Sequence, residues 1–433
     1  MDKKYKTIAA IDIGTTKIVS IIGRKDENGV IDILGLGKSP SKGVRRGLVY
    51  NIEEAVGAIN NAVSAAKEMS GIDFDEVYVG IAGQYIRSLR MSKQKYIDSK
   101  IGEIKKEDVD SLTQEMYKIP VEPEEEILHV IPQEYIVDGE ISDQPVGVSG
   151  KVLEGNFHIV VAQVTSAFNI KKCIERVNLN TKELILEPIA SAHAVLTEDE
   201  KEAGVALVDI GGGTTDIAIY YDKIIKHTAV IPFGGNVITS DIRSGFKILE
   251  RYAEQLKIKF GSALPEETKE NEVVTVPGIS GREPKEISLK NLAYIINARM
   301  VEIIGAIKFQ IESSGIADKL GAGIVITGGG AMLKHLPQLF SYETGMDVRI
   351  GLPNRYLKGK FADEINKSMY STSVGLILKG YEDIEKNSDP YEYTEEQKEK
   401  KKDKKEKDKK SGKKITSLLK QIGGIFDDND NTF

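Results

Sequence analysis

Short apolar stretches with the alternation of β-strands dominate the beginning of the chain, and one longer stretch has helical spacing. An apolar run ends at Asp12, and the alternating segment Ile18–Ile22 follows it after a Gly-Thr turn, which predicts strand, tight turn and strand. Between Ile52 and Met69, apolar residues recur as on one face of a helix. Val77–Gly83 is an apolar run closed by glycine. The first 83 residues therefore predict an α/β arrangement.

Two segments interrupt this pattern and form distinct blocks. Residues 84–162 contain the alternating run Glu134–Gly139 and the strand-like run Phe157–Ala162. Residues 241–317 end in Leu289–Ser313, whose apolar spacing predicts a long helix. We expect each block to be a subdomain attached to the α/β body.

The chain also repeats one motif. Ala10–Lys17 returns as Leu207–Asp216, and in both copies an apolar run ends in an aspartate, Asp12 or Asp209, before a turn of glycines and threonines. Glycines let the backbone approach a ligand closely, and clustered N–H groups with threonine hydroxyls form an anion pocket. A carboxylate beside such a pocket is unfavourable unless a cation binds there too, and Mg²⁺ is the usual cation between carboxylates and phosphates. Two such hairpins facing each other would clamp a nucleoside triphosphate.

A third segment fits a nucleotide site. Gly323–Thr327 has the composition of a buried strand, the glycines Gly328, Gly329 and Gly330 end it, and Met332–Leu336 is helix-like. A strand, a glycine turn and a helix N-terminus together form a site for a nucleotide phosphate or sugar. The spacing differs from the G-x-G-x-x-G fingerprint of dinucleotide-binding proteins and from the P-loop.

The order of these motifs resembles the superfamily of actin, sugar kinases and DnaK-type chaperone ATPases. Five segments match its two phosphate motifs, its adenosine motif and its two connecting helices, respectively: Ile8–Ile22, Val205–Ile219, Ala322–Leu336, Glu187–Ala194 and Tyr370–Ile377. The resemblance covers about residues 5–385. It implies an α/β fold with two lobes, built from two duplicated ribonuclease-H-like domains.

Composition narrows the function further. The 433 residues, 40% of them hydrophobic, suit a globular body with sizeable cores. The single cysteine, Cys173, excludes an intramolecular disulfide, which fits a reducing compartment, and we expect it to be a buried apolar residue in a helix. A net charge of −7 does not favour nucleic-acid binding. No segment has the pattern of a signal peptide or a membrane span, so we expect a cytoplasmic protein unless its tail reaches a membrane.

The tail differs in kind from the body. Lys, Asp and Glu dominate residues 395–414, and such a segment cannot bury a core, which predicts a solvated linker. Beyond it, five large apolar residues share one face of a helix: Ile415, Leu418, Leu419, Ile422 and Phe426. With lysines upstream, this face predicts an in-plane helix on an anionic membrane. The alternatives are docking on the body or on a partner protein, and Gly423 with Gly424 indicates a helix that folds only when bound.

One family combines these features. Leu128–Gly139 and Pro145–Gly150 resemble the extra subdomain of the FtsA family, bacterial cell-division homologues of actin, which also carry a linker and an amphipathic membrane helix. The resemblance implies a protein that binds ATP, hydrolyses it slowly at most, polymerises head to tail, and anchors FtsZ filaments of the division ring to the cytoplasmic face of the membrane. Later division proteins would bind residues 84–162. The acidic extension 427–433 departs from many family members.

The same resemblance implies a division of the chain into parts. These are domain I (1–83, 163–192 and 366–386), the inserted SHS2-like subdomain (84–162), the domain II core (193–240 and 318–365), its outer, FtsZ-binding subdomain (241–317), the charged linker (387–412), the membrane helix (413–426) and the acidic tail (427–433).

It also implies roles for individual residues. Asp12 and Asp209 would hold Mg²⁺, through water, and Asp209 and Glu187 are the catalytic candidates. The phosphates would lie between the two hairpins, in contact with Gly14, Thr15, Thr16 and Lys17 on one side and Gly212, Gly213, Thr214 and Thr215 on the other. The nucleoside would lie near Gly234, Gly235, Asn236, Arg299, Glu302 and the three glycines 328–330.

Some of these assignments have structural alternatives. Glu187 would position the attacking water, or it would cap a helix that has Pro188 in its first turn. Arg299 and Glu302 would flank the nucleoside, or they would form a salt bridge on a helix surface. Asp216 would orient a threonine or a metal-bound water, or satisfy the turn. The five histidines show no metal-binding spacing, and we expect them to be structural.

Three other functions are compatible with the superfamily. A small-molecule kinase would need a catalytic carboxylate facing a sugar cleft, and neither the block 84–162 nor the tail is expected in it. A peptide-binding chaperone would need a β-rich substrate domain, where this chain has only a charged linker and one helix. A pilus-assembly relative of FtsA has a similar extra subdomain but normally lacks the membrane tail.

Overall fold

A computed structural model describes residues 6–26, 29–97 and 102–387. The chain up to Gly380 forms one compact unit. The predicted membrane helix and acidic tail, and the linker after its first residue, lie outside the described residues, and with them Ile415, Leu418, Leu419, Ile422 and Phe426. In the described part of the chain, none of the helices combines the length and the apolar character needed to cross a membrane.

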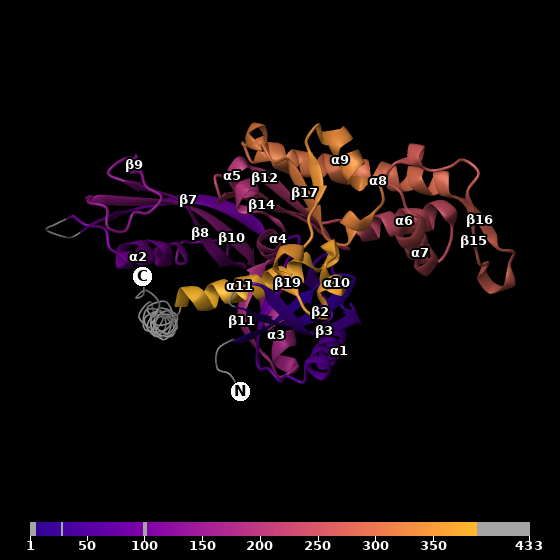
Figure 1. Ribbon diagram of the computed structural model, residues 1–433, viewed down its shortest axis with the longest axis horizontal. Helices are drawn as coiled ribbons and strands as arrows, with labels where there is room; N and C mark the ends of the chain where they lie inside the picture. The colour runs from indigo at the N-terminus through magenta and orange to yellow at the C-terminus, as the bar shows by residue number, and fades with distance from the viewer. Residues whose placement is uncertain (1–5, 27–28, 98–101, 388–433) are drawn as a thin grey trace, which may run out of the picture. The chain divides into compact units, whose positions relative to one another are not determined.

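The first lobe is built on a six-stranded sheet (Figure 1). Its strands, in spatial order, are β11 (Asn180–Leu186), β6 (Glu76–Ile81), β1 (Thr7–Ile13), β2 (Lys17–Lys25), β3 (Ile31–Pro40) and β19 (Leu357–Lys358). Strands β1, β2 and β3 form an antiparallel meander. Strands β6 and β11 extend the sheet beyond β1 and run parallel to it. The short β19 lies in the segment assigned to domain II, yet it pairs with β3 of this sheet.

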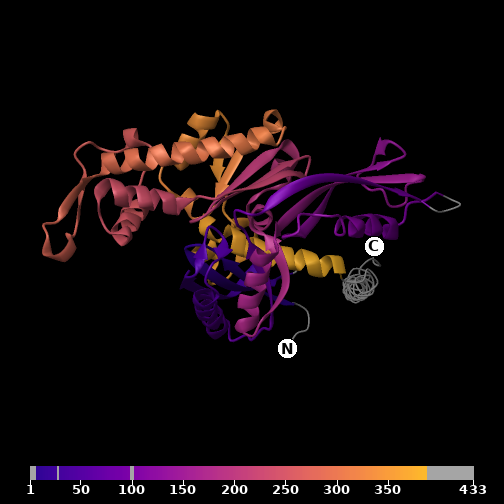
Figure 2. The same ribbon diagram turned by 180° about the vertical axis from the view of Figure 1, so that it is seen from behind.

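Two helices cover one face of this sheet, as Figure 2 shows from behind. They are α1 (Ile52–Ser70) and α3 (Val164–Arg176). Helix α1 begins where the Asn51 side chain accepts the Glu54 amide proton and ends at Gly71 in the left-handed conformation, the usual cap residues for the two ends. Cys173 lies buried on α3 within the same core, as predicted, and burial raises the pKa of its thiol to about 11.

The second lobe repeats this topology. Its sheet has the order β14 (Ile224–Ile231), β13 (Thr215–Tyr221), β12 (Val205–Ile210), β17 (Ile324–Thr327) and β18 (Val348–Ile350). Strands β12, β13 and β14 again form an antiparallel meander. Strands β17 and β18 extend the sheet beyond β12 and run parallel to it. This agreement confirms the two-lobed α/β fold that the resemblance implied.

Residues 84–162 form a separate sheet with its own hydrophobic core. The strands are β7 (Arg87–Tyr96), β10 (Val152–Gln163), β8 (Glu125–Val137) and β9 (Glu140–Ile141), and α2 (Lys106–Met116) packs against them (Figures 1 and 2). A small hairpin in the first lobe joins β4 (Val44–Arg45) to β5 (Leu48–Val49).

This inserted sheet is bonded to the edge strand β14 of the second lobe, mostly from side chain to backbone. Ser88 Oγ donates to the carbonyl of Thr228 (3.2 Å), Arg90 to that of Lys226 (3.0 Å) and Gln133 to that of Ile225 (2.5 Å). The His158 ring adds a contact to the Thr228 hydroxyl at 2.9 Å. Burial lowers the pKa of His158 to about 4, which fits the structural role expected for the histidines.

The outer subdomain surrounds the long helix predicted over 289–313. It contains α6 (Gly235–Phe246), α7 (Glu250–Phe260), the hairpin of β15 (Val273–Val276) and β16 (Lys285–Ser288), and α8 (Leu289–Ser313). Figure 1 shows α8 alongside α6 and α7. Helix α8 starts at Ser288, whose hydroxyl accepts the Asn291 amide proton, and its buried face carries mostly isoleucines.

One predicted helix is wrong. After the three glycines the chain forms a single 3₁₀ turn, Gly330–Met332, and α9 begins only at Leu336 and runs to Thr344. His335 precedes it in the left-handed conformation, with φ of 60°, and Pro337 occupies the first turn of α9, where a proline loses no hydrogen bond. The remaining short helices are α5 (Glu198–Ala203) and α10 (Ala362–Ile365).

Helices α4 (Glu187–Val195) and α11 (Ser371–Asn387) cross between the two sheets. Gly375 of α11 lies so near α4 that a methyl group on it would overlap the carbonyl oxygen of Ala190. Only glycine permits this approach, as expected for the two connecting helices. The N-terminal turns of α4 and α11 therefore lie beside the ends of β1 and β12.

Candidate functional site

The two glycine-threonine hairpins lie against each other. A methyl group on Gly213 would overlap Thr15, and one on Gly212 would overlap Thr16. The hairpin of the second lobe closes through a bond from the Gly211 amide to the Thr214 carbonyl, 2.9 Å. Thr15 in turn accepts a proton from the Gly47 amide (3.1 Å). The structure thus brings together the residues predicted to enclose the phosphates from both sides.

Four carboxyl groups gather behind these hairpins. Asp12 and Asp209 are 7% exposed and Asp216 is 3% exposed, and Glu187 at the start of α4 interacts with all three charges. Asp209 and Asp216 stand directly opposite each other on β12 and β13, an unfavourable arrangement for two like charges. The equivalent partner of Asp12 on β2 is Val19, so only the second copy of the motif carries the additional acid.

Burial raises the pKa of every member of this cluster. The pKa of Asp209 rises to about 6 and that of Asp216 to about 8, with burial as the main cause and neighbouring carboxylates as an additional one. Burial also raises the pKa of Asp12, against the opposing effects of Lys17 and Ser373, and burial together with the three aspartates raises the pKa of Glu187. Asp216 accepts a bond from the Thr214 hydroxyl (2.9 Å), whereas its Oδ1 is buried without a partner.

Hydroxyl groups from the two crossing helices hold the aspartates. Asp209 Oδ2 accepts bonds from Ser191 of α4 (2.6 Å) and from Thr372 of α11 (3.2 Å). Asp12 Oδ2 accepts a bond from Ser373 of α11 (3.0 Å). Sequence reasoning missed these three hydroxyls, because the two helices were identified only by their resemblance to the connecting helices of the superfamily.

Lys17 was expected at the phosphates, but its ammonium group is engaged elsewhere. It donates to the carbonyl of Met369 (2.5 Å) and lies 4.2 Å from the ring centre of Tyr370. Burial lowers its pKa to about 8, although the carboxylates of Asp12 and Asp209 act in the opposite direction. Lys17 therefore neutralises part of the acidic cluster from the side.

The third motif meets the second hairpin through its first glycine. Gly328 has φ of +86°, and a side chain there would overlap the carboxyl group of Asp209. Its amide donates to the Ser368 carbonyl (3.2 Å), and its carbonyl accepts the Ser368 hydroxyl proton (2.8 Å). Gly330 packs against Ile210, whereas a methyl group on Gly329 would meet nothing within 4 Å. Gly329 is thus the glycine of this turn that faces open space.

The segment expected near the ribose contacts the second hairpin. The amides of Gly235 and Asn236, in the first turn of α6, donate to the carbonyls of Gly211 (2.9 Å) and Gly212 (2.8 Å). A side chain on Gly234 would overlap the carbonyl of Gly211. These residues therefore support the shape of the hairpin, and the backbone amides of Gly235 and Asn236 are hydrogen-bonded within the protein.

The structural alternatives are decided by geometry for two of the remaining residues. Arg299 forms a bidentate pair with Asp241 (2.6 and 3.1 Å) and also bonds Glu302, its neighbour one turn along α8. The salt-bridge interpretation of Arg299 and Glu302 is therefore correct. The cap residue of α4 is Leu186, not Glu187, and the carboxyl group of Glu187 belongs to the acidic cluster.

The cluster has the chemistry of a cation site. Three buried aspartates and a glutamate with raised pKa values, one of them with an unpartnered oxygen, would each gain from a nearby positive charge. Within the described residues, no group of three or more His, Cys, Asp or Glu side chains is arranged to hold a metal ion by itself. A Mg²⁺ bound here would therefore need further oxygens from phosphate and water, which is its usual habit.

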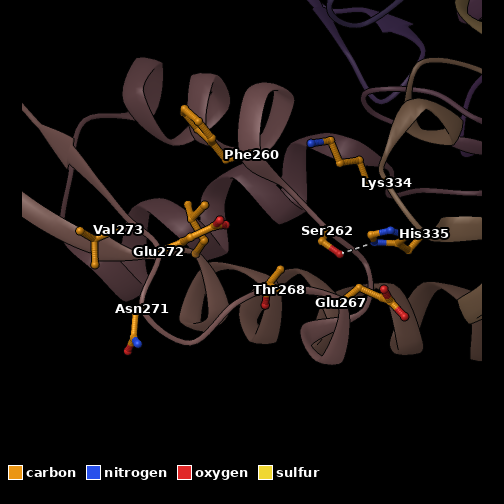
Figure 3. A pocket seen from close by; sticks show the side chains of 10 residues that line it. Phe260, Ser262, Glu267, Thr268, Asn271, Glu272, Val273, Lys334 and His335 are labelled. Carbon is orange, nitrogen blue, oxygen red and sulfur yellow. Dashed lines mark hydrogen bonds between the residues drawn. The ribbon is translucent and has the colours of Figure 1, made fainter.

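A cavity of about 600 Å³ lies away from this site, in the outer subdomain (Figure 3). Its wall combines apolar side chains, among them Phe260 and Val273, with the polar Ser262. Lys334 and His335, from the segment after the glycine turn, complete it, and Ser262 Oγ lies 2.9 Å from His335 Nδ1. This cavity holds none of the predicted site residues.

The chain matches known proteins over most of its length. The family described as cell division protein FtsA matches residues 206–375, and the SHS2 domain inserted in FtsA matches residues 83–161. Cell division protein FtsA of Neisseria meningitidis serogroup B is 39% identical over 379 residues, which are 87% of this chain and 91% of that protein. That of Pseudomonas aeruginosa is 37% identical over 385 residues, 89% and 91% of the two chains.

Solved structures share the fold at low sequence identity. A chain of the PilM-PilN type IV pilus biogenesis complex has a TM-score of 0.62 at 14% identity, covering 86% of this chain and 98% of that one. MreB 5 of Spiroplasma citri bound to AMPPNP has a TM-score of 0.56 at 14% identity, covering 88% and 99%. The fold is therefore actin-like, and the chain belongs to the FtsA family of cell division proteins.

Proposed function

We propose that this chain binds ATP together with Mg²⁺ between its two hairpins. The observation that supports this most directly is the acidic cluster immediately behind two facing glycine-threonine turns. Asp12 and Asp209 would hold the cation, which would shield the acids and the phosphates from each other. Glu187 would position water, and hydrolysis would be slow, because no basic group is paired with a nucleophile in the cluster.

Gly329→Asp is expected to weaken ATP binding about 100-fold. The new carboxylate would enter the open space beside the glycine turn, where the nucleotide would approach the backbone, so it would obstruct the nucleoside and add a negative charge beside an anionic ligand. Gly329→Ala is the matched control, because its methyl group meets no atom within 4 Å, and we expect less than about a threefold change. Calorimetric titration with ATP and with adenosine measures both. Equal affinity of the wild type for the two ligands would argue against a phosphate site.

Following its family, the chain would anchor FtsZ filaments to the cytoplasmic face of the membrane at the division site. The apolar face formed by residues 415–426 would lie in the membrane surface. The outer subdomain 241–317 would bind FtsZ, and its cavity, whose lining combines apolar side chains such as Phe260 with polar and charged ones such as Glu267 and Lys334, is a suitable place for part of that partner. The inserted subdomain 84–162 would contact a neighbouring copy in a head-to-tail filament and bind later division proteins.

Removal of residues 411–433 is expected to abolish co-sedimentation of FtsZ with anionic liposomes while leaving FtsZ binding in solution intact. Leu419→Glu should have the same effect, because it places a charge in the middle of the apolar face. Gln421→Glu adds the same charge off that face and is the matched control. Sedimentation with and without liposomes separates the two activities. Full recruitment of FtsZ by the truncated protein would refute the tether.

A further inference from the structure

Three consecutive hydroxyl side chains at the start of α11 each contact a different nucleotide motif. Their partners are the end of β17, the second hairpin and the first hairpin, in that order: Ser371 Oγ to Thr327 Oγ1 (2.6 Å), Thr372 Oγ1 to Asp209 Oδ2 (3.2 Å) and Ser373 Oγ to Asp12 Oδ2 (3.0 Å). One helical turn thus connects all three motifs. The preceding residues Ser368 and Met369 extend this, through their bonds to Gly328 and Lys17.

Around Asp209 these bonds close into a ring. Ser191 of α4 lies 2.6 Å from Asp209 Oδ2 and 2.9 Å from the Thr372 hydroxyl, which itself lies 3.2 Å from the same carboxylate oxygen. Only two hydroxyl protons are available for these three contacts. Whichever hydroxyl donates to the other, the remaining hydroxyl still donates to the Asp209 carboxylate, so the carboxylate keeps one orientation. The ring joins one residue from each crossing helix to the acid at the end of β12.

Packing alone does not explain these hydroxyls. Ser191 and Ser373 are 0% and 1% exposed, and a buried hydroxyl costs free energy unless it is hydrogen-bonded. The close approach of the helices is made by Gly375 against Ala190. An alanine or valine would fill the hydroxyl positions without that cost. Their bonds are directed at the two aspartates, Asp12 and Asp209, that begin the two hairpins.

We propose that Thr372 and Ser373, together with Ser191, are positioning residues that hold Asp209 and Asp12 in place for the cation accompanying the nucleotide phosphates. This inference rests on the proposed binding of Mg²⁺ and ATP. Thr372 and Ser373 are adjacent on one helix, so they fix the acids of the two lobes relative to each other as well as individually. A cation between the lobes would otherwise have to order both carboxylates when it binds.

Thr372→Val tests the proposal, because valine keeps the shape of the side chain and removes the hydroxyl. ATP affinity measured with Mg²⁺ should fall about tenfold, the loss expected for one hydrogen bond to a charged group. The affinity in EDTA should stay the same, because the residue acts through the cation. Thr372→Ser restores the hydroxyl and should restore the affinity. Thr344→Val is the matched control, since that hydroxyl has only backbone partners near the end of its own helix, the Phe340 carbonyl (2.7 Å) and the Met346 amide (3.3 Å).

Ser373→Ala provides a second test, because Ser373 bonds the other aspartate, Asp12. It takes the place of the first test if Thr372→Val does not fold. An unchanged affinity with Mg²⁺ in both variants overturns the positioning role, as does an equal loss in Mg²⁺ and in EDTA, which would indicate a purely structural effect. Wild-type protein that binds no ATP with Mg²⁺ would instead overturn the nucleotide proposal itself. ATP binding by the wild type with Mg²⁺ therefore distinguishes a failure of the positioning role from a failure of the nucleotide proposal.

Discussion

Replacing Gly375 with alanine is expected to destabilise the protein by more than about 3 kcal/mol, because the new methyl group would overlap the carbonyl oxygen of Ala190. Helix α4 would have to move, and it carries Glu187 and Ser191. Backbone atoms cannot rotate away as a flexible side chain does, so no inexpensive relaxation is available. The expected result is a large fall in the urea midpoint, or no soluble protein.

Gly305→Ala is the matched control for this prediction. Gly305 also lies inside a long helix, α8, but a methyl group there would meet nothing within 4 Å. Alanine is the better helix former, so this variant should gain about 0.5–1 kcal/mol. Urea unfolding at one pH measures both variants. Similar stabilities for the two would show that the crossing of α4 and α11 yields easily, contrary to the close packing described.

The acidic cluster gives the second large effect, and it depends on pH. The pKa values of Asp209 and Asp216 are raised to about 6 and about 8 in the folded protein, whereas both are near 4 when unfolded. The stability that these groups contribute is therefore fully present below about pH 4 and is lost as pH rises through 6 and 8. Without nucleotide or cation, the wild type should lose stability across this range.

Asp216→Asn should remove much of that loss. We expect the variant to be more stable than the wild type by about 3 kcal/mol at pH 8.5 and by less than about 1 kcal/mol at pH 4.5. Asparagine can still accept the proton of the Thr214 hydroxyl. Unfolding in EDTA at both pH values measures the difference. Asp318→Asn, at an exposed position, is the control and should change the free energy of unfolding little at either pH. If Asp216→Asn is no more stable than the wild type at pH 8.5, the burial of this charge is contradicted.

The local elements could be predicted because their signals are local. Strand β1, the hairpins after Asp12 and Asp209, and the helix over 289–313 each follow from apolar spacing and from glycines within a few residues. The repeat then supplied a relation between two distant hairpins, and the resemblance built on it correctly implied two similar domains. The facing of the two hairpins was expected from the repeat, whereas the contact of Thr15 with Gly213 is known only from the structure.

The remaining features depend on contacts between segments far apart in sequence. Ser191 and Thr372 meet across 181 positions, and no spacing rule connects them. The family pattern assigns Lys17 to the phosphates, and it does not predict the bond from its ammonium group to the carbonyl of Met369, 352 positions away. The helix predicted at 332–336 failed because the apolar residues there pack in a turn that ends at a left-handed His335.

The attachment of the inserted sheet to β14 has a consequence for sequence divergence. Ser88, Arg90 and Gln133 donate to backbone carbonyls of β14, and every residue type supplies a carbonyl. The half-buried side chain of Lys226 can therefore vary among homologues without loosening the joint, whereas the three donors cannot. Because the bonds also occupy carbonyls of an edge strand, they leave fewer groups to which a foreign strand could pair. Substitution rates on the two sides of this joint should differ accordingly.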